Sequence, residues 1–386
     1  MTQRTVIAAA LAAALGLAAG AAQAQGQGPI KIGSFLAVTG GASFLGDPEA
    51  KTLRLYVERI NKSGGVLGRQ LQLIVHDSAG DAKQAATFAK RLIEDDKVDI
   101  LIGGSTTGET MAIVKMVDEA ELPFLSLGGA SVIVEPVKER KWVFKTPHSD
   151  RLAVQKVYVD MKARGLTAVA IIAGSGGFDQ SCRKNAQELA PTMGMRVVAD
   201  ETYAPTDTDV TPQLTKIKNA AGVQAVLGCG FGGITSITAK NYKQLAMTQP
   251  FYFNHGVGSK QFITGAAGGA EGIRLPAAAL LVAADLPDSD PQKKPALEYA
   301  AAYKAAFNED ISTFGGHALD ALLIAVDAFK RAGSTDKKKV RDAIESTKGL
   351  IGVDGIFTFS AADHNGLDEA SFKMVVVQNG EFRLLK

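Results

Sequence analysis

The segment Gly103–Gly108 is the part of this sequence best suited to hold a small anion. It reads GGSTTG, follows the apolar run VDILI and precedes a helical pattern. Hydroxyls and free backbone N–H groups should therefore lie at the carboxyl end of a strand, where ligands of open α/β sheets bind. A carboxylate removed from water needs such donors. We expect Ser105, Thr106 and Thr107 to form a carboxylate site, although an ordinary helix cap would use the same residue types.

Other loops that follow predicted strands bring glycine backbone and aromatic side chains to the same region. The segment LGGAS, residues 127–131, follows one strand and should place Gly128, Gly129 and Ala130 near the anion. Phe44, Phe178 and Phe231 each lie in a loop after another predicted strand. Each phenylalanine alone is better explained by packing. Three of them at strand ends together favour an apolar wall for a ligand.

Several kinds of chemistry find no support in the sequence. There is no GxSxG nucleophile elbow, no HExxH metal motif and no phosphate-binding loop, although GSGG at residues 174–177 follows a strand. The chain has 42 Lys and Arg against 40 Asp and Glu, a balance that does not indicate a nucleic-acid surface. We therefore expect no enzyme activity, no metal and no cofactor.

The elements that must position these loops alternate between short apolar runs and helical patterns. This alternation occurs once from Pro29 to about residue 127 and again from Ser149 to about residue 253. Such order is typical of parallel sheets covered by helices. The sequence thus predicts an α/β fold with two Rossmann-like lobes. A C-terminal hairpin is expected to turn at Asn379-Gly380.

Residues 1–24 are predicted to be a cleavable secretory signal. They combine one charged residue, Arg4, an apolar run and the small-residue ending Ala22-Gln23-Ala24. The apolar run is too short for a membrane span, so the mature protein is expected to be soluble and periplasmic. That oxidising compartment permits a disulfide between Cys182 and Cys229, the two cysteines of the chain, without requiring one.

A longer motif resembles a known family. The run INKSGGVLGR at residues 60–69, continuing through LQLIVHD at 71–77 to AGDAKQA at 79–85, resembles the leucine/isoleucine/valine-binding proteins, which are type I periplasmic substrate-binding proteins of ABC importers. The TGG…GD pattern from Thr39 to Asp47 also fits. The resemblance implies two lobes joined by three crossovers, here near residues 145–149, 273–277 and 353–360, with the ligand in the cleft. The N-terminal lobe would then comprise residues 25–146 plus 277–352, and the C-terminal lobe residues 147–276 plus 353–386.

The resemblance also implies roles for the pocket loops, and this sequence departs from two of them. Amino-acid-binding relatives hold the ligand carboxylate with the loop that matches Ser105–Thr107 and add backbone contacts from the loop that matches Gly128–Ala130. They pair the ligand ammonium with a glutamate, whereas the matching segment here, residues 230–236, contains no acid. An expected pocket tyrosine is replaced by Phe178.

We therefore expect the ligand to be a small carboxylate without an α-amine. An aromatic ligand ring could lie against Phe44, Phe178 and Phe231, and Asn254 and His255 are candidates for binding a second polar group. The expected partner is an ABC permease, with no nucleic acid, and the expected state is a monomer. The alternatives are an aliphatic amino-acid-binding protein of the same family, a sensor that signals to another protein, and a secreted α/β enzyme.

Overall fold

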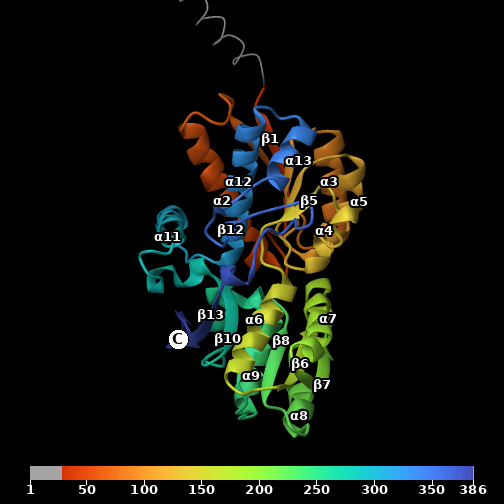
Figure 1. Ribbon diagram of the computed structural model, residues 1–386, viewed down its shortest axis with the longest axis vertical. Helices are drawn as coiled ribbons and strands as arrows, with labels where there is room; N and C mark the ends of the chain where they lie inside the picture. Colours follow the sequence, from red (N-terminus) through yellow and green to blue (C-terminus); the bar gives the residue numbers. More distant parts are fainter. Residues whose placement is uncertain (1–27, 386) are drawn as a thin grey trace, which may run out of the picture.

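Two β-sheets form the centres of two lobes stacked along the long axis of the molecule (Figure 1). The structure is a computed structural model that describes residues 28–385, so the predicted signal segment lies outside the described residues. The first sheet is parallel throughout, in the order β2 (Leu71–Asp77), β1 (Ile30–Leu36), β3 (Ile100–Gly103), β4 (Phe124–Ser126), β5 (Val143–Lys145). The predicted α/β fold is confirmed.

Helices cover both faces of the first sheet. One face packs against α2 (Ser43–Lys62), α12 (Thr313–Ala332) and α13 (Lys337–Glu345), and α2 and α12 lie side by side. The other face packs against α3 (Ala82–Glu94), α4 (Thr107–Met111) and α5 (Val114–Glu119). Helix α11 (Lys293–Phe307) lies at the side, next to α2.

The second sheet adds an antiparallel hairpin to a parallel core. Its order is β14 (Glu381–Leu384), β13 (Phe372–Gln378), β10 (Arg274–Ala278), β9 (Phe251–Phe253), β8 (Ala225–Cys229), β6 (Ala168–Gly174), β7 (Arg196–Tyr203). The hairpin turn at Asn379-Gly380 is confirmed, with φ of +54° and +70° as a type I′ turn requires.

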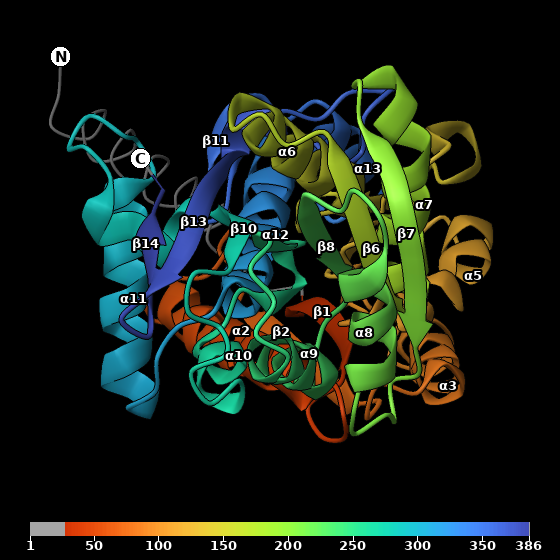
Figure 2. The ribbon, with the colours of Figure 1, turned by 90° about the horizontal axis from the view of Figure 1, so that it is seen from below.

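The helices of the second lobe sandwich its sheet (Figure 2). Strand β6 is buried on both faces: Val169 and Ile171 contact the side of α6 (Asp150–Ala163) and α7 (Gly177–Thr192). Ala170 and Ile172 face the side of α8 (Thr211–Asn219), α9 (Gly233–Gln244) and α10 (Lys260–Gly265). This alternation explains why the buried strand reads as one continuous apolar run.

The remaining short elements connect the larger ones. Strands β11 (Leu350–Ile351) and β12 (Ile356–Phe357) form a small antiparallel pair. The 3₁₀ segments are η1 (Ser131–Ile133), η2 (Val137–Glu139), η3 (His255–Val257), η4 (Ala279–Asp285) and η5 (Glu369–Ser371).

The chain crosses between the lobes at three places. The first crossover joins β5 to α6 through residues 146–149. Strand β10 pairs with β9 and β13 in the second sheet, so a boundary at residue 277 would cut this strand. Phe357 and Phe359, which a boundary at residue 353 assigns to the second lobe, pack in the core of the first. We therefore propose that the second crossover follows Ala278 and that the third lies between Phe359 and Phe372.

The start of α2 differs from what local signals indicate, in a way that matters for the site. Asp47-Pro48 is typical of a helix N-cap followed by proline at the first helical position, yet the helix begins at Ser43, with Pro48 inside it. A tertiary contact explains the extra turn, since a β-carbon on Gly46 would lie 2.3 Å from the Ala37 carbonyl. The longer helix carries Phe44 and Leu45 toward the second lobe.

Candidate functional site

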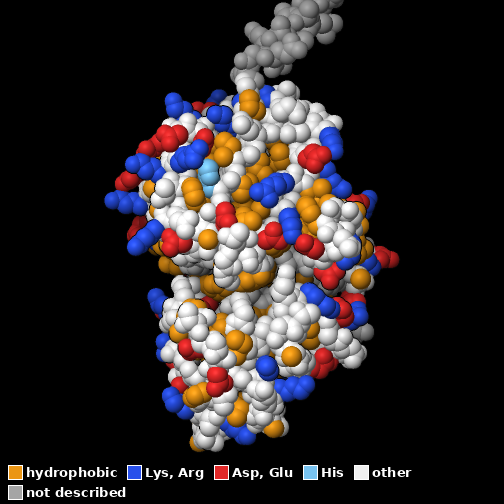
Figure 3. All heavy atoms as spheres, turned by 180° about the vertical axis from the view of Figure 1, so that it is seen from behind, with side chains coloured by type: hydrophobic (Ala, Val, Ile, Leu, Met, Phe, Trp, Pro, Cys, Tyr) orange, Lys and Arg blue, Asp and Glu red, His pale blue; other side chains and the backbone are white. Residues whose placement is uncertain are grey.

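A cavity lies between the two lobes, at the narrow waist seen in Figure 3. It holds about 390 Å³ of space not filled by atoms, including space open to solvent. The first lobe and α12 contribute Leu45, Ser105, Thr106, Thr107, Leu127, Gly129, Phe314 and His317; the crossover contributes Pro147; the second lobe contributes Phe178, Phe231, His255 and Gly256. None of these lining residues is Asp, Glu, Lys or Arg.

The structure brings most of the predicted site residues together. Those that line the cavity are Ser105, Thr106, Thr107, Gly129, Phe178, Phe231 and His255. The others lie behind this lining: Phe44, Gly128, Ala130 and Asn254 are not part of it. Phe44 packs against Phe231 and Phe314, with ring centroids 6.0 and 5.6 Å apart, and so supports the aromatic wall from behind.

The three hydroxyls of the predicted carboxylate loop have different roles. The Ser105 hydroxyl accepts a hydrogen bond from the Ala37 N–H at 3.0 Å and donates to Glu49. The Thr106 hydroxyl accepts the Glu109 N–H in a capping box at the start of α4. Thr107 Oγ1 is buried and has no hydrogen-bond partner among the described residues. The hydroxyls of Thr106 and Thr107 therefore each keep a hydrogen for a ligand anion, and Thr107 Oγ1 has no other partner among the described residues.

Behind Ser105, a buried acid completes the support of the loop. Glu49 is 1% exposed, and burial raises the pKa of its carboxyl well above the ordinary value. Burial thus favours the uncharged form of Glu49, which places no negative charge beneath a bound carboxylate.

Lys145 supplies positive charge just outside the cavity lining. Its Nζ donates to the carbonyls of Gly129, Pro147 and His148 at 3.1, 2.7 and 3.1 Å. The side chain is fully buried, and burial lowers the pKa of Lys145 to about 7. Three carbonyl acceptors match the three donors of an ammonium group. An anion in the cavity would further favour this charged form.

The aromatic wall comes from the second lobe. The Phe178 and Phe231 ring centroids lie 5.9 Å apart with a steep angle between the rings. The His255 ring is nearly perpendicular to that of Phe178, with centroids 5.2 Å apart. A disulfide between Cys182 in α7 and Cys229 at the end of β8, with Cα atoms 5.7 Å apart, ties together the two segments that carry these phenylalanines.

His255 and Asn254 differ in what they can offer a ligand. Both ring nitrogens of His255 are buried and lack a hydrogen-bond partner among the described residues, and burial lowers the pKa of this imidazole well below its ordinary value. Asn254 instead uses Oδ1 to cap the Gly256 N–H at 3.0 Å. Of the two residues predicted to bind a second polar group, only His255 lines the cavity.

Sequence reasoning did not identify Leu45, Leu127, Pro147, Gly256, Phe314 or His317 as lining residues. Leu127 and Gly256 are direct neighbours of predicted residues, and Pro147 lies in the expected first crossover, so proximity was the available signal. Phe314 and His317 lie in the first turns of α12, far along the chain from every pocket loop, where no local pattern marks them.

Among residues 28–385, no group of three or more His, Cys, Asp or Glu side chains could hold a metal ion. No helix in the same range is long and apolar enough to cross a membrane.

Comparisons with known proteins place this geometry among ligand-binding proteins. Residues 29–381 match the family model described as periplasmic binding protein. A leucine-, isoleucine-, valine-, threonine- and alanine-binding protein of Pseudomonas aeruginosa is 25% identical over 335 residues, covering 84% of this chain and 86% of that protein. An extracellular ligand-binding receptor from Rhodopseudomonas palustris HaA2 is 28% identical, with a TM-score of 0.86 over 93% of this chain and 100% of that chain. The LivJ substrate-binding protein of Streptococcus pneumoniae, solved with isoleucine, shares the fold at 24% identity with a TM-score of 0.81 over 93% of this chain and 99% of that chain.

Proposed function

The chain belongs to the periplasmic binding protein family, and we propose that it captures a small carboxylate without an α-amine for an ABC importer. The ligand enters between the open lobes, the lobes close over it, and the closed form docks on a permease in the inner membrane. We further propose that the protein acts as a periplasmic monomer and releases its ligand chemically unchanged.

The absence of an acidic side chain from the cavity lining carries the ligand proposal. The ammonium group of an amino acid would be buried in this cavity with no carboxylate opposite it. An unpaired buried charge costs several kcal/mol, whereas a micromolar ligand binds with only about −8 kcal/mol in total. The loop after β8, where amino-acid-binding relatives are expected to carry a glutamate, presents Phe231 to the cavity instead.

A carboxylate finds better support. Thr107 Oγ1 is an unpartnered hydroxyl at the cavity, and Gly129 brings backbone to the same lining. Lys145 holds the Gly129 carbonyl from behind, so positive charge lies one peptide group away from the cavity. In a low-dielectric site this charge attracts an anion without direct contact.

Apolar side chains dominate the rest of the lining and favour a ligand with an apolar body. Leu45, Leu127, Phe178, Phe231 and Phe314 surround the space. Aromatic rings prefer edge-to-face or offset packing against one another, and Phe178 and Phe231 already take a steep mutual angle. Aromatic acids of the benzoate and cinnamate type are therefore the first class to test.

The decisive experiment compares each amino acid with an acid in which the α-ammonium is absent or is replaced by an oxo group. Thermal shift and calorimetry on the purified protein should show binding of 4-methyl-2-oxopentanoate but not leucine, and of 3-phenylpropionate but not phenylalanine. Benzoate and cinnamate extend the series. Stabilisation by leucine alone would overturn the amine-free proposal and favour the amino-acid-binding alternative, which the name of the Pseudomonas relative supports.

A separate experiment tests whether the protein converts its ligand. Mass spectrometry of the ligand recovered after prolonged incubation should give the mass of the compound that was added. A converted product would contradict the role of a pure binding protein.

A further inference from the structure

His317 is a polar group at the cavity that the carboxylate site does not use. It lies in α12, is 4% exposed and lines the cavity. Its Nδ1 is 2.6 Å from Oδ2 of Asp354, a fully buried residue between β11 and β12. Gly316 makes room for this pair, because a β-carbon there would lie 2.6 Å from the same carboxyl oxygen. With Nδ1 facing Asp354, Nε2 is the ring nitrogen left for the cavity.

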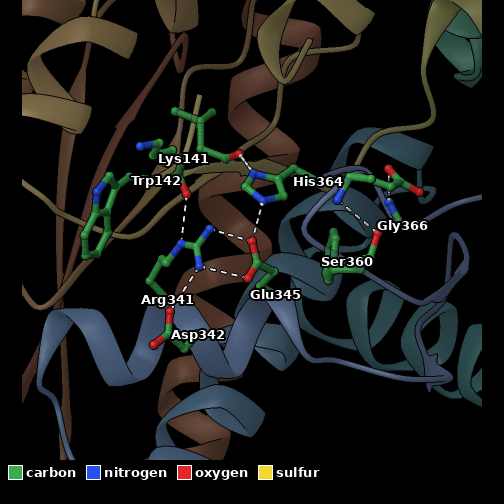
Figure 4. Close-up of polar contacts among 12 residues, drawn as sticks. Lys141, Trp142, Arg341, Asp342, Glu345, Ser360, His364 and Gly366 are labelled. Atoms are coloured by element: carbon green, nitrogen blue, oxygen red, sulfur yellow. Dashed lines mark hydrogen bonds and ion pairs between the residues drawn. The ribbon is translucent and has the colours of Figure 1, made fainter. Parts of the chain in front are cut away.

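In a second histidine–acid pair, His364 with Glu345, both ring nitrogens have partners within the fold (Figure 4). His364 Nδ1 contacts the Val143 carbonyl at 2.8 Å, and its Nε2 contacts Glu345 at 3.2 Å. Arg341 in turn binds Glu345. Both nitrogens of His364 are thus used within the fold, whereas Nε2 of His317 has no hydrogen bond to any residue that the structure describes.

Burial favours the uncharged forms of both Asp354 and His317. It raises the pKa of the Asp354 carboxyl and lowers that of the His317 imidazole to about 3. Lys145 and the His148 ring lie near the pair, with the His148 and His317 ring centroids 6.5 Å apart. Asp320 contacts the other residue of the pair, since it accepts the Val353 and Asp354 N–H groups at 2.7 and 2.9 Å. Asp320 opposes a second negative charge nearby. His317 Nδ1 and Asp354 Oδ2 lie 2.6 Å apart. When the protonated Asp354 carboxyl donates across this contact, the hydrogen of the neutral imidazole lies on Nε2.

The cavity therefore contains more polar groups than one carboxylate can satisfy. Thr107 Oγ1 and the two nitrogens of His255 are buried there without a hydrogen-bond partner among the described residues, and His317 lies in the same lining. Buried polar groups that gain no partner when a ligand displaces water reduce affinity. A wholly apolar ligand body would leave the histidines in that state.

We propose that His317, oriented by Asp354, donates a hydrogen bond from Nε2 to a second ligand oxygen, so that the ligand is a hydroxy- or oxo-substituted acid. His317 thus determines specificity, and Asp354 is a positioning residue. This inference rests on the proposed binding of an amine-free carboxylate and narrows its ligand class.

The test measures dissociation constants for matched acids by calorimetry. The pairs are benzoate with 3- and 4-hydroxybenzoate, and cinnamate with 4-hydroxycinnamate. We expect at least one hydroxylated acid to bind roughly tenfold tighter than its parent. H317F should bring that ratio close to one. D354N should keep it, since an amide N–H can donate to Nδ1 as a protonated carboxyl does. H364F, the same change at the other buried pair, should also keep it.

Contrary results have distinct meanings. Equal weakening of hydroxylated and parent acids by H317F would show that His317 holds the carboxylate, and would overturn the inference. A wild-type ratio near one for every pair would do the same. Loss of the ratio in D354N would show that an uncharged hydrogen-bond donor to Nδ1 is not sufficient, and would refute that role of Asp354. If no acid of the panel binds while leucine does, the proposed function itself fails.

A second measurement does not depend on the folding of a variant. The chain has five histidines, so ¹⁵N spectra can follow each imidazole in the wild-type protein. His317 should carry its hydrogen on Nε2, and this signal should shift with the hydroxylated acid and not with the parent. A hydrogen on Nδ1 instead would contradict the donor role.

Discussion

Gly129 of the first lobe and Phe178 of the second meet so closely that a β-carbon on Gly129 would lie 2.7 Å from Phe178 Cε2. The same β-carbon would lie 3.2 Å from His255 Nε2. Both distances span the cavity between the lobes, so the absence of a side chain at Gly129 allows this closed arrangement.

G129A should therefore weaken ligand binding at least tenfold, because the added methyl group opposes closure over the ligand. Calorimetry with the best acid of the panel measures the change. The melting temperature without ligand should move little, since each lobe keeps its own core.

G233A is the matched control for this prediction. Gly233 is the first residue of α9 in the second lobe, and a β-carbon there would meet nothing within 4 Å. Its affinity should equal that of the wild type. Unchanged affinity in G129A would show that the bound state is more open than this structure.

Lys145 should make ligand binding dependent on pH. Burial lowers its pKa to about 7, so at pH 7 about half of the free protein carries the ammonium. A bound carboxylate favours the charged form. Binding should thus take up as much as about half a proton at pH 7, and affinity should fall as the pH rises from 7 to 9.

Calorimetry in buffers with different ionisation enthalpies measures this proton uptake directly. K145M should bind the acids roughly tenfold or more weakly and should show no proton uptake near pH 7. Affinity and uptake that do not vary with pH in the wild type would exclude Lys145 as the counter-charge.

Local sequence patterns were sufficient for the elements that are buried on both faces. Strand β6 reads AVAIIAG because its residues alternate between two apolar layers. The hairpin turn was predictable because Asn379 and Gly380 are residue types that adopt positive φ. The loops at the carboxyl ends of parallel strands were located for the same reason: strand order alone brings them to one edge.

The parts that could not be predicted depend on contacts between distant segments. Ser105 was predicted to hold the ligand carboxylate, but its hydroxyl already donates a hydrogen bond to Glu49 in α2 and accepts one from the Ala37 N–H. His317 lies in no sequence motif, and only the fold shows that it lines the cavity with Nδ1 against Asp354. Hydrogen-bond satisfaction is a property of three-dimensional neighbours, so residue type and spacing cannot decide it.

Asp179 should contribute stability to the free protein in mild acid that is lost at neutral pH. Burial raises the pKa of this carboxyl to about 7. The folded state then holds a proton between about pH 4 and 7 that the unfolded state has lost, so the free energy of unfolding falls as the pH rises through this range. The full effect is at most about 4 kcal/mol.

D179N should remove this contribution, because an amide does not ionise. Urea unfolding at pH 5 and pH 8 measures it: the wild type should lose more stability between the two values than the variant. Equal losses in both proteins would mean that Asp179 is ionised in the folded state at both pH values.

The Cys182–Cys229 disulfide should stabilise the second lobe mainly by restricting the unfolded chain. The bridge closes a loop of 47 residues, for which the chain-entropy relation gives about 4 kcal/mol. The double variant C182S/C229S should unfold at a clearly lower urea concentration than the oxidised wild type, and dithiothreitol should lower the wild-type midpoint toward that of the variant while leaving the variant unchanged. Because the bridge also ties α7 to the end of β8, the variant should bind ligand more weakly through loss of the fixed relation between Phe178 and Phe231. Identical midpoints with and without reductant would show that the bridge adds no stability.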